Sequence, residues 1–151
     1  MIFYIDASAV LAVVGDEVAS LAVDRIVRSP EARIVISDFA IAESSAVLAR
    51  DGRVGRWADA EMERLYRDLD IWTLGVGEKS EITPTDLVAA TAFVRLPGVT
   101  LRAPDAIHIA AAQRIGATLL TLDRGMARAA DVLGVPCINP AEADAPGDLK
   151  D

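Results

Sequence analysis

Short runs of apolar, β-forming residues recur along this chain, and helix signals separate them. The runs occupy residues 2–5, 33–37, 118–122 and 135–138. Because they are apolar at nearly every position, they lack the alternation of a strand with one solvated face, and they predict strands buried on both faces. Alternating strands and helices favour a mainly parallel sheet. The sequence therefore predicts one α/β sandwich.

Capping residues and glycines mark the helices between these runs. We expect Ser8 to cap a helix that continues through Val14. Further helices are predicted over residues 39–49, 53–70, 84–96, 104–115 and 124–133. Residues 71–74 are interpreted as an additional strand and residues 75–81 as a loop. In the helix that follows Thr83, the buried side is predicted to comprise Leu87, Val88, Ala92 and Leu96.

Length and charge narrow the class of protein. The 151 residues suit one domain, which we place at residues 1–140, followed by a flexible acidic tail at 141–151. A net charge of −8 excludes a generally basic, DNA-coating surface. A single cysteine, Cys137, allows no intrachain disulfide, and the start of the chain lacks the basic and apolar regions of a signal peptide. We expect a cytoplasmic location.

Two aspartates directly follow predicted strands. Asp6 comes after residues 2–5 and Asp123 after residues 118–122. In open α/β sheets, sites form beyond the carboxyl ends of the strands, so both side chains are expected at one rim. Each aspartate taken alone is also a normal helix N-cap.

Two further acids fall on apolar helix faces. Glu43 has Phe39, Ala40, Ala46 and Val47 as its neighbours one turn away. An unpaired charge there is costly, so Glu43 should be protonated, paired with an arginine or bound to a cation. Asp105 opens the segment 103–112, which is apolar around most of its circumference and must be buried, although a cap is again the simpler role.

Clustered carboxylates repel one another, and a hard divalent cation keeps several of them ionised together. Oxygen ligands select Mg²⁺ or Mn²⁺ over zinc, and such an ion suits phosphodiester hydrolysis. Other chemistries have little support. The chain has one histidine, no glycine-rich phosphate loop after a strand, and a cysteine that lies in an apolar strand.

Four fragments, taken together and in this order, resemble the PIN-domain superfamily, in particular the VapC-like toxin ribonucleases of type II toxin–antitoxin pairs. They are residues 4–9 (YIDASA), Ala42-Glu43 within residues 37–48, residues 104–110 (PDAIHIA) and residues 120–123 (LTLD). The similarity covers nearly the whole chain. It implies a three-layer α/β/α sandwich around the predicted sheet.

The resemblance also implies roles for individual residues. Asp6, Glu43, Asp105 and Asp123 would form the acidic quartet that binds Mg²⁺ or Mn²⁺ for endonucleolytic cleavage of single-stranded RNA. Ser8 and Thr121 match hydroxyl positions beside the quartet, although Ser8 also suits a helix cap and Thr121 a plain strand residue. A homodimer and a cognate antitoxin that blocks the acidic pocket are further expectations from the resemblance.

A histidine, several arginines and three aromatic residues outside the acidic quartet are further candidates for function. His108, one turn beyond Asp105, either bonds within the site or is a satisfied buried histidine, and we leave it out of the catalytic set. Arg124 and Arg128 are candidate RNA contacts. Further arginines either flank the RNA, form solvated pairs or meet a partner: Arg50, Arg53, Arg56, Arg64 and Arg67. The nearby aromatics, predicted to pack in the core or to receive an antitoxin helix, are Trp57, Tyr66 and Trp72.

Two other functions compete with the ribonuclease. A small-molecule phosphohydrolase or a phosphorylated receiver domain also uses an acid after the first strand with Mg²⁺. Ser8, however, stands where a phosphatase of the Asp-x-Asp type would repeat the acid. The second alternative is a PIN-like module that binds metal, RNA or a partner without turnover.

Overall fold

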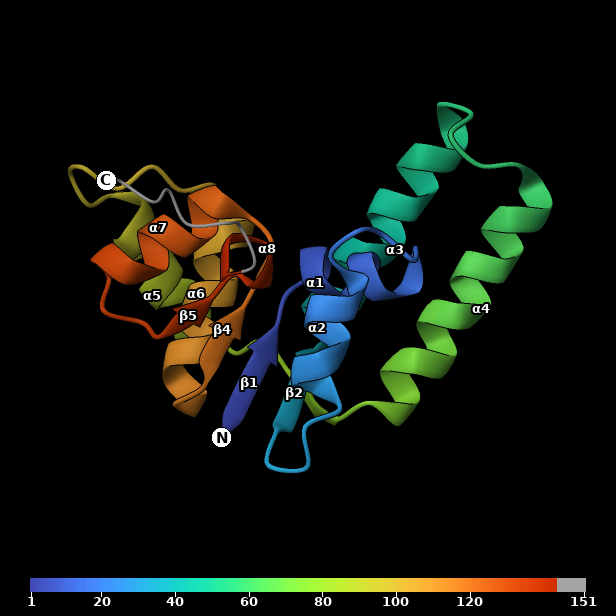
Figure 1. Ribbon diagram of the computed structural model, residues 1–151. Helices are drawn as coiled ribbons and strands as arrows, with labels where there is room; N and C mark the ends of the chain where they lie inside the picture. Colours follow the sequence, from blue (N-terminus) through green and yellow to red (C-terminus); the bar gives the residue numbers. More distant parts are fainter. Residues whose placement is uncertain (144–151) are drawn as a thin grey trace, which may run out of the picture.

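The computed structural model describes residues 1–143, which form a parallel five-stranded sheet covered by helices on both faces (Figure 1). The strand order is β3-β2-β1-β4-β5, and every neighbouring pair is parallel. The strands are β1 (Ile2–Ile5), β2 (Arg33–Ser37), β3 (Glu78–Ser80), β4 (Thr118–Leu120) and β5 (Cys137–Ile138). The predicted α/β sandwich and its parallel strands are confirmed, and β1, β2 and β4 are largely buried. Strands β4 and β5 are shorter than the predicted 118–122 and 135–138, and β5 is only half-buried.

Two layers of helices enclose the sheet. Helices α1 (Ala7–Val14), α2 (Ser20–Val27), α3 (Asp38–Arg53) and α4 (Asp59–Gly75) lie on one side. Helices α5 (Pro84–Val94), α6 (Ala103–Ile115) and α7 (Arg124–Val132) lie on the other. Alternate residues of β1 serve the two layers: Phe3 and Ile5 pack towards α1–α4, whereas Tyr4 packs towards α6 and α7.

Helix α4 and strand β3 differ from the sequence prediction. Residues 71–74, expected as a strand, continue α4, because the buried spacing of Leu65 and Leu69 extends to Thr73. The expected loop at residues 75–81 contains β3, a short edge strand of polar residues. Gly77 enters this strand where an added Cβ would lie 2.2 Å from the Ile34 carbonyl oxygen, so the close approach to β2 requires glycine.

Helix α5 buries a different face from the predicted one. Leu87, Val88 and Leu96 are exposed, and the buried residues of this helix are Asp86 and Ala90. The reason is the partner helix: α6 presents the small residues Ala106 and Ala110, onto which α5 packs through Ala90. Because the side chains at this contact are small, the face of α5 that carries Asp86 and Ala90 is buried in place of the face that carries the leucines.

The prediction that Ser8 caps α1 is wrong, whereas the capping role expected for Asp6 is confirmed. Asp6, not Ser8, is the cap, and its carboxylate accepts a hydrogen bond from the Ala9 amide. Ser37 caps α3 through the Ala40 amide, and Thr83 caps α5 through the Asp86 amide.

At the carboxyl end, Pro140–Ala143 form a short helix, α8, where the tail was expected to begin, and the rest of that predicted tail lies outside the described residues. No helix within residues 1–143 has the length and apolar character needed to span a membrane.

Candidate active site

The site lies where the order of strands reverses. The chain builds β1, β2 and β3 outward to one side, then returns to place β4 against the other edge of β1. Loops diverge at such a switch point and leave a crevice beyond the strand ends. Asp6 follows β1, and Thr121 and Asp123 follow β4, so these side chains come from the two strands that border the crevice.

Asp6 is the most buried of the four acids, with 2% of its surface exposed. Its carboxylate accepts hydrogen bonds from the Ser8 hydroxyl at 2.8 and 2.9 Å, from the Thr121 hydroxyl at 2.6 Å and from the Ala9 amide at 3.0 Å. Burial raises the pKa of Asp6, whereas nearby His108 and these hydrogen bonds act in the opposite direction. No lysine or arginine among residues 1–143 forms an ion pair with it.

The two hydroxyls join the loops that follow β1 and β4. Ser8 accepts a hydrogen bond from the Leu122 amide at 2.8 Å, and Thr121 accepts one from the Asp123 amide at 3.0 Å. Asp123 in turn caps α7 through the Met126 amide. Asp6 and Asp123 are therefore linked through a single threonine side chain.

Arg102 lies between the other two aspartates. Its guanidinium donates to both oxygens of Asp105, at 3.0 and 3.1 Å, and lies 4.0 Å from an oxygen of Asp123. Sequence reasoning missed Arg102. Its position three residues before Asp105, at the start of a helix, was the available signal, because residues at this spacing share a helix face.

Glu43 is paired with a histidine, not with the arginine considered from the sequence. Its Oε2 lies 2.5 Å from His108 Nε2, with 28% of the Glu43 side chain exposed and 1% of the His108 side chain. His108 is thus a buried histidine with both ring nitrogens hydrogen-bonded, which was the simpler of the two roles expected for it. The Nε2 bond is to one of the four acids.

In the part of the chain that the structure describes, hydrogen bonds and ion pairs join Asp6, Asp123 and Asp105 into one set, from which Glu43 is separate, and the four acids do not form a closed ligand cage. Thr121 links Asp6 to Asp123, Arg102 links Asp123 to Asp105, and Glu43 contacts His108. Within residues 1–143, no three acidic, histidine or cysteine side chains converge closely enough to hold an ion as they stand.

The donor set nevertheless suits a hard divalent cation. It consists of carboxylate oxygens with hydroxyls beside them, and Asp6 is a buried carboxylate without a cationic partner. An ion bound here would take over the charge compensation that Arg102 gives Asp105 and Asp123.

Comparison with protein families identifies the family to which this fold belongs. The family model of the PIN domain matches residues 3–132. The chain belongs to the PIN domain family. Among curated proteins, none matches the sequence.

Solved structures share the fold of this PIN domain at low sequence identity. VapBC2 from Rickettsia felis, bound to a DNA fragment from their promoter, is 15% identical with a TM-score of 0.68, covering 91% of this chain and 98% of that chain. VapC20 from Mycobacterium tuberculosis, a sarcin-ricin loop cleaving toxin, is 15% identical with a TM-score of 0.66, covering 84% and 94%. FitAcB from Neisseria gonorrhoeae is 19% identical with a TM-score of 0.68, covering 93% and 99%.

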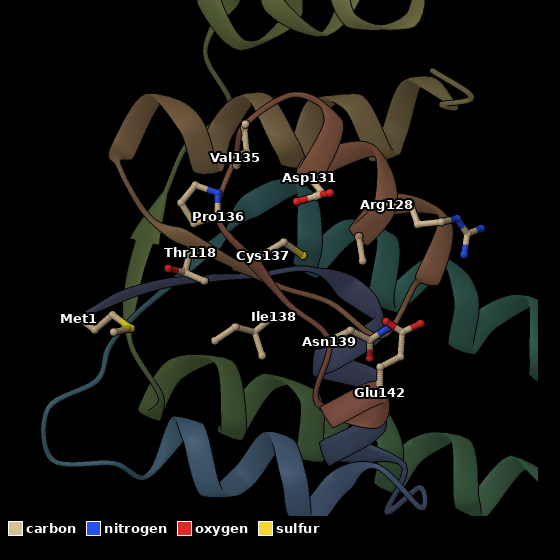
Figure 2. A pocket seen from close by; sticks show the side chains of 12 residues that line it. Met1, Thr118, Arg128, Asp131, Val135, Pro136, Cys137, Ile138, Asn139 and Glu142 are labelled. Atoms are coloured by element: carbon tan, nitrogen blue, oxygen red, sulfur yellow. The ribbon is translucent and has the colours of Figure 1, made fainter. Parts of the chain in front are cut away.

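The arginines proposed as RNA contacts lie outside the acidic set. Arg124 pairs with Glu142 at 3.3 Å. Arg128 lines a separate hollow of about 750 Å³ beside β5, together with Cys137 and Asn139 (Figure 2). None of the four acids lines this hollow. Among residues 1–143 of this PIN domain, Arg102 is the one arginine that forms an ion pair with any of the four acids.

The arginines and aromatics near α4 have mixed surroundings. Arg50 and Arg56 pair with Asp51, and Arg64 pairs with Asp68. The aromatic residues are partly buried against the core, as the simpler expectation required: Trp57, Tyr66 and Trp72.

Proposed function

We propose that this PIN domain is a divalent-metal-dependent endoribonuclease that cleaves single-stranded RNA as the toxin of a type II toxin–antitoxin pair. The observation that carries the proposal is Asp6, a buried carboxylate at the switch point of the sheet with no cationic partner among the described residues. Thr121 bonds to the Asp6 carboxylate and to the Asp123 amide, and Arg102 pairs with both Asp105 and Asp123. Burying a carboxylate without a cationic partner costs free energy, and a purely structural site gains nothing from that cost, whereas a metal site does.

In this proposal Asp6, Glu43, Asp105 and Asp123 hold Mg²⁺ or Mn²⁺. When bound, the ion supplies an activated water and neutralises charge on the phosphate. Ser8 and Thr121 hold the Asp6 carboxylate by donating hydroxyl protons to it. Arg102 stabilises the neighbouring acids before the ion binds, and is then available to contact an RNA phosphate.

The proposed partners rest on the relatives. The neighbours of known structure include VapBC2 and FitAcB, and VapC20 is described as a sarcin-ricin loop cleaving toxin. By analogy we propose an RNA substrate, a cognate antitoxin protein and a homodimer for this chain. The arginines Arg124 and Arg128 remain candidates for binding RNA beyond the site.

Metal removal tests the activity directly. Purified protein, freed of any antitoxin, is incubated with end-labelled RNAs and Mg²⁺, Mn²⁺ or EDTA. We expect discrete cleavage products with either metal and none with EDTA. Metal binding without cleavage of any RNA would instead favour a binding module, and hydrolysis of small phosphate esters alone would favour a phosphohydrolase.

Replacing Arg102 separates its two proposed effects. Because the guanidinium competes with a cation for Asp105, Arg102→Gln should bind Mn²⁺ as tightly as the wild type or more tightly. Loss of a phosphate contact should meanwhile lower kcat/KM for RNA by about tenfold. Calorimetric Mn²⁺ titration and cleavage assays measure the two effects. Weaker Mn²⁺ binding with unchanged cleavage would contradict both.

A further inference from the structure

A continuous chain of buried side chains begins and ends on helix α3. The Ala40 amide donates to Ser37 Oγ at 3.0 Å, and Ser37 Oγ lies 2.7 Å from Tyr4 Oη. Tyr4 Oη lies 2.8 Å from His108 Nδ1, whose Nε2 contacts Glu43. The chain therefore runs from the first turn of α3, through β1 and α6, back to a residue further along α3.

The two ends of the chain determine its proton positions. The Ala40 amide can only donate, and an ionised Glu43 carboxylate can only accept. With a neutral imidazole, His108 must donate from Nε2, so its Nδ1 accepts from the Tyr4 hydroxyl. Tyr4 must then accept from Ser37. One orientation thus satisfies every donor and acceptor along the chain.

Burial makes this arrangement rigid. Tyr4 and Ser37 are fully buried, and His108 is nearly so. The ring of Phe39 packs against the imidazole with centroids 5.1 Å apart. Burial also raises the pKa of the Tyr4 hydroxyl, although the Ser37 hydrogen bond acts against this, so its proton remains in place to be donated. A fully satisfied network in a low-dielectric interior holds its members in single positions.

Within residues 1–143, Glu43 is the one acid of the four that has no side-chain hydrogen bond from a residue close in sequence, and its carboxylate bonds only to the distant His108. Asp6 is held by three neighbours, Asp105 by two bonds from Arg102, and Asp123 by its capping bond. Glu43 has a longer side chain with an extra rotatable bond, and His108 provides its one side-chain contact within residues 1–143. Without that hydrogen bond, the carboxylate would no longer be held in one orientation.

We propose that Ser37, Tyr4 and His108 form a positioning chain that holds Glu43 in place as a metal ligand, without touching the ion or the RNA themselves. This inference rests on the proposed metal-dependent function. A purely structural network predicts changes in folding stability alone, whereas the positioning chain predicts that metal affinity changes through Glu43.

Two substitutions of His108 distinguish the contribution of Nε2, which contacts Glu43, from that of Nδ1, which contacts Tyr4. The amide of His108→Gln reaches the position of Nε2 and can still donate to Glu43. The amide of His108→Asn reaches only the position of Nδ1. Partners of metal ligands usually contribute 10- to 100-fold to affinity, so we expect about tenfold weaker Mn²⁺ binding for the Asn variant. We expect the Gln variant to stay within about threefold of the wild type, and Tyr4→Phe to fall between the two.

A double-mutant cycle tests whether the chain acts through Glu43. Glu43→Gln should weaken Mn²⁺ binding, and adding His108→Asn to it should weaken binding no further, because the group being positioned is gone. Val23→Ala, in the core of α2, is the control for general loosening, and it should lower stability without altering Mn²⁺ affinity.

NMR spectroscopy tests the hydrogen-bond directions along the chain in the metal-free protein. His108 is the only histidine in the sequence, so ¹⁵N-labelled histidine gives one imidazole signal set. We expect the Nε2–H tautomer in the metal-free wild type, and a shifted Nδ1 resonance in Tyr4→Phe, which also serves if the His108 variants do not fold.

The outcomes separate the two proposals. Absence of Mn²⁺ binding by the wild-type protein overturns the proposed function and the positioning chain with it. Normal Mn²⁺ binding with equal affinities for the Asn and Gln variants overturns the positioning chain alone. An Nδ1–H tautomer, or a further loss of affinity when His108→Asn is added to Glu43→Gln, also overturns it alone.

Discussion

Asp6→Asn is expected to lower the rate of RNA cleavage by at least about 100-fold while making the folded protein more stable. The substitution removes one charge from the proposed metal site but keeps an oxygen in the same place. Asparagine is also a good N-cap: its single oxygen can accept from the Ala9 amide and the Ser8 hydroxyl, while its amide nitrogen faces Thr121 Oγ1, which must then accept instead of donate. Cleavage assays with Mn²⁺ measure the first effect.

The stability increase follows from the direction of the Asp6 pKa. Burial raises the pKa above its ordinary value of 3.8, so the ionised form is disfavoured by folding. For an acid with a raised pKa, stability is greatest at low pH and falls as pH rises through the folded-state pKa. At neutral pH, without metal, Asp6→Asn should therefore have a higher Tm than the wild type.

Metal addition should reverse that order. Mn²⁺ binds the folded wild-type protein and raises its Tm, whereas Asp6→Asn should gain little. Asp70→Asn, an exposed residue of α4, is the matched control and should behave as the wild type in every assay. A less stable, inactive Asp6→Asn variant would instead mean that the carboxylate is structural.

The parts of the fold that the sequence predicts well are those with local causes. Residues 2–5 and 33–37 are recognisable as buried strands because residues 2–5 and the central residues 34–36 are apolar at consecutive positions, on both faces of the strand. Thr83 with Pro84 predicts the start of α5, since a hydroxyl cap followed by proline suits a first helical turn. Such signals act over three or four residues and need no knowledge of tertiary contacts.

The failures have long-range causes. Strand β3 is polar and short, and pairs because Gly77 lets the chain approach β2, which no local pattern announces. The side of α5 that is buried depends on the small residues of α6, so apolar Leu87 was assigned to the wrong face. Likewise Tyr4 and His108 are 104 residues apart, and only folding reveals that they are bonded.

The candidate site likewise contains residues that local signals predict and one that they do not. Asp6 and Asp123 could be placed at one rim from the strand ends they follow, and the fold brings both to the crevice. Arg102 was missed although it lies three residues before Asp105, because an arginine near a helix start is usually a solvated surface charge. Its importance depends on the two aspartates that lie within its reach.

Asp86→Asn is expected to reduce the free energy of unfolding by about 2–3 kcal/mol. Asp86 is buried to 1% exposure, accepts two bonds from Arg114 at 2.7 and 3.0 Å, and completes the capping of α5 through the Thr83 amide. Asparagine preserves the shape and the capping acceptor but removes the charge. Arg114 is then left without its buried counter-ion. Urea unfolding measures the loss.

The pH dependence of the stability difference between wild type and Asp86→Asn provides a control for this prediction. Burial raises the pKa of Asp86, but bonds from Arg114 and Thr83 outweigh it, so the pKa lies below its ordinary value of 3.8. The stability from a lowered acid pKa is present above that ordinary value and lost as pH falls through the folded-state pKa. The gap between wild type and Asp86→Asn should therefore be full at about pH 6 and close below 3.8.

The exposed ion pair of Asp24 with Arg28 is the matched comparison, because it joins the same residue types on the surface of α2. Asp24→Asn should cost less than about 0.5 kcal/mol, and added salt should reduce that further. Equal losses for Asp24→Asn and Asp86→Asn would mean that burial adds nothing to the inner pair. A large loss confined to Asp86→Asn, with RNA cleavage per folded molecule unchanged, would mean that this pair stabilises the α5–α6 layer independently of the acidic site.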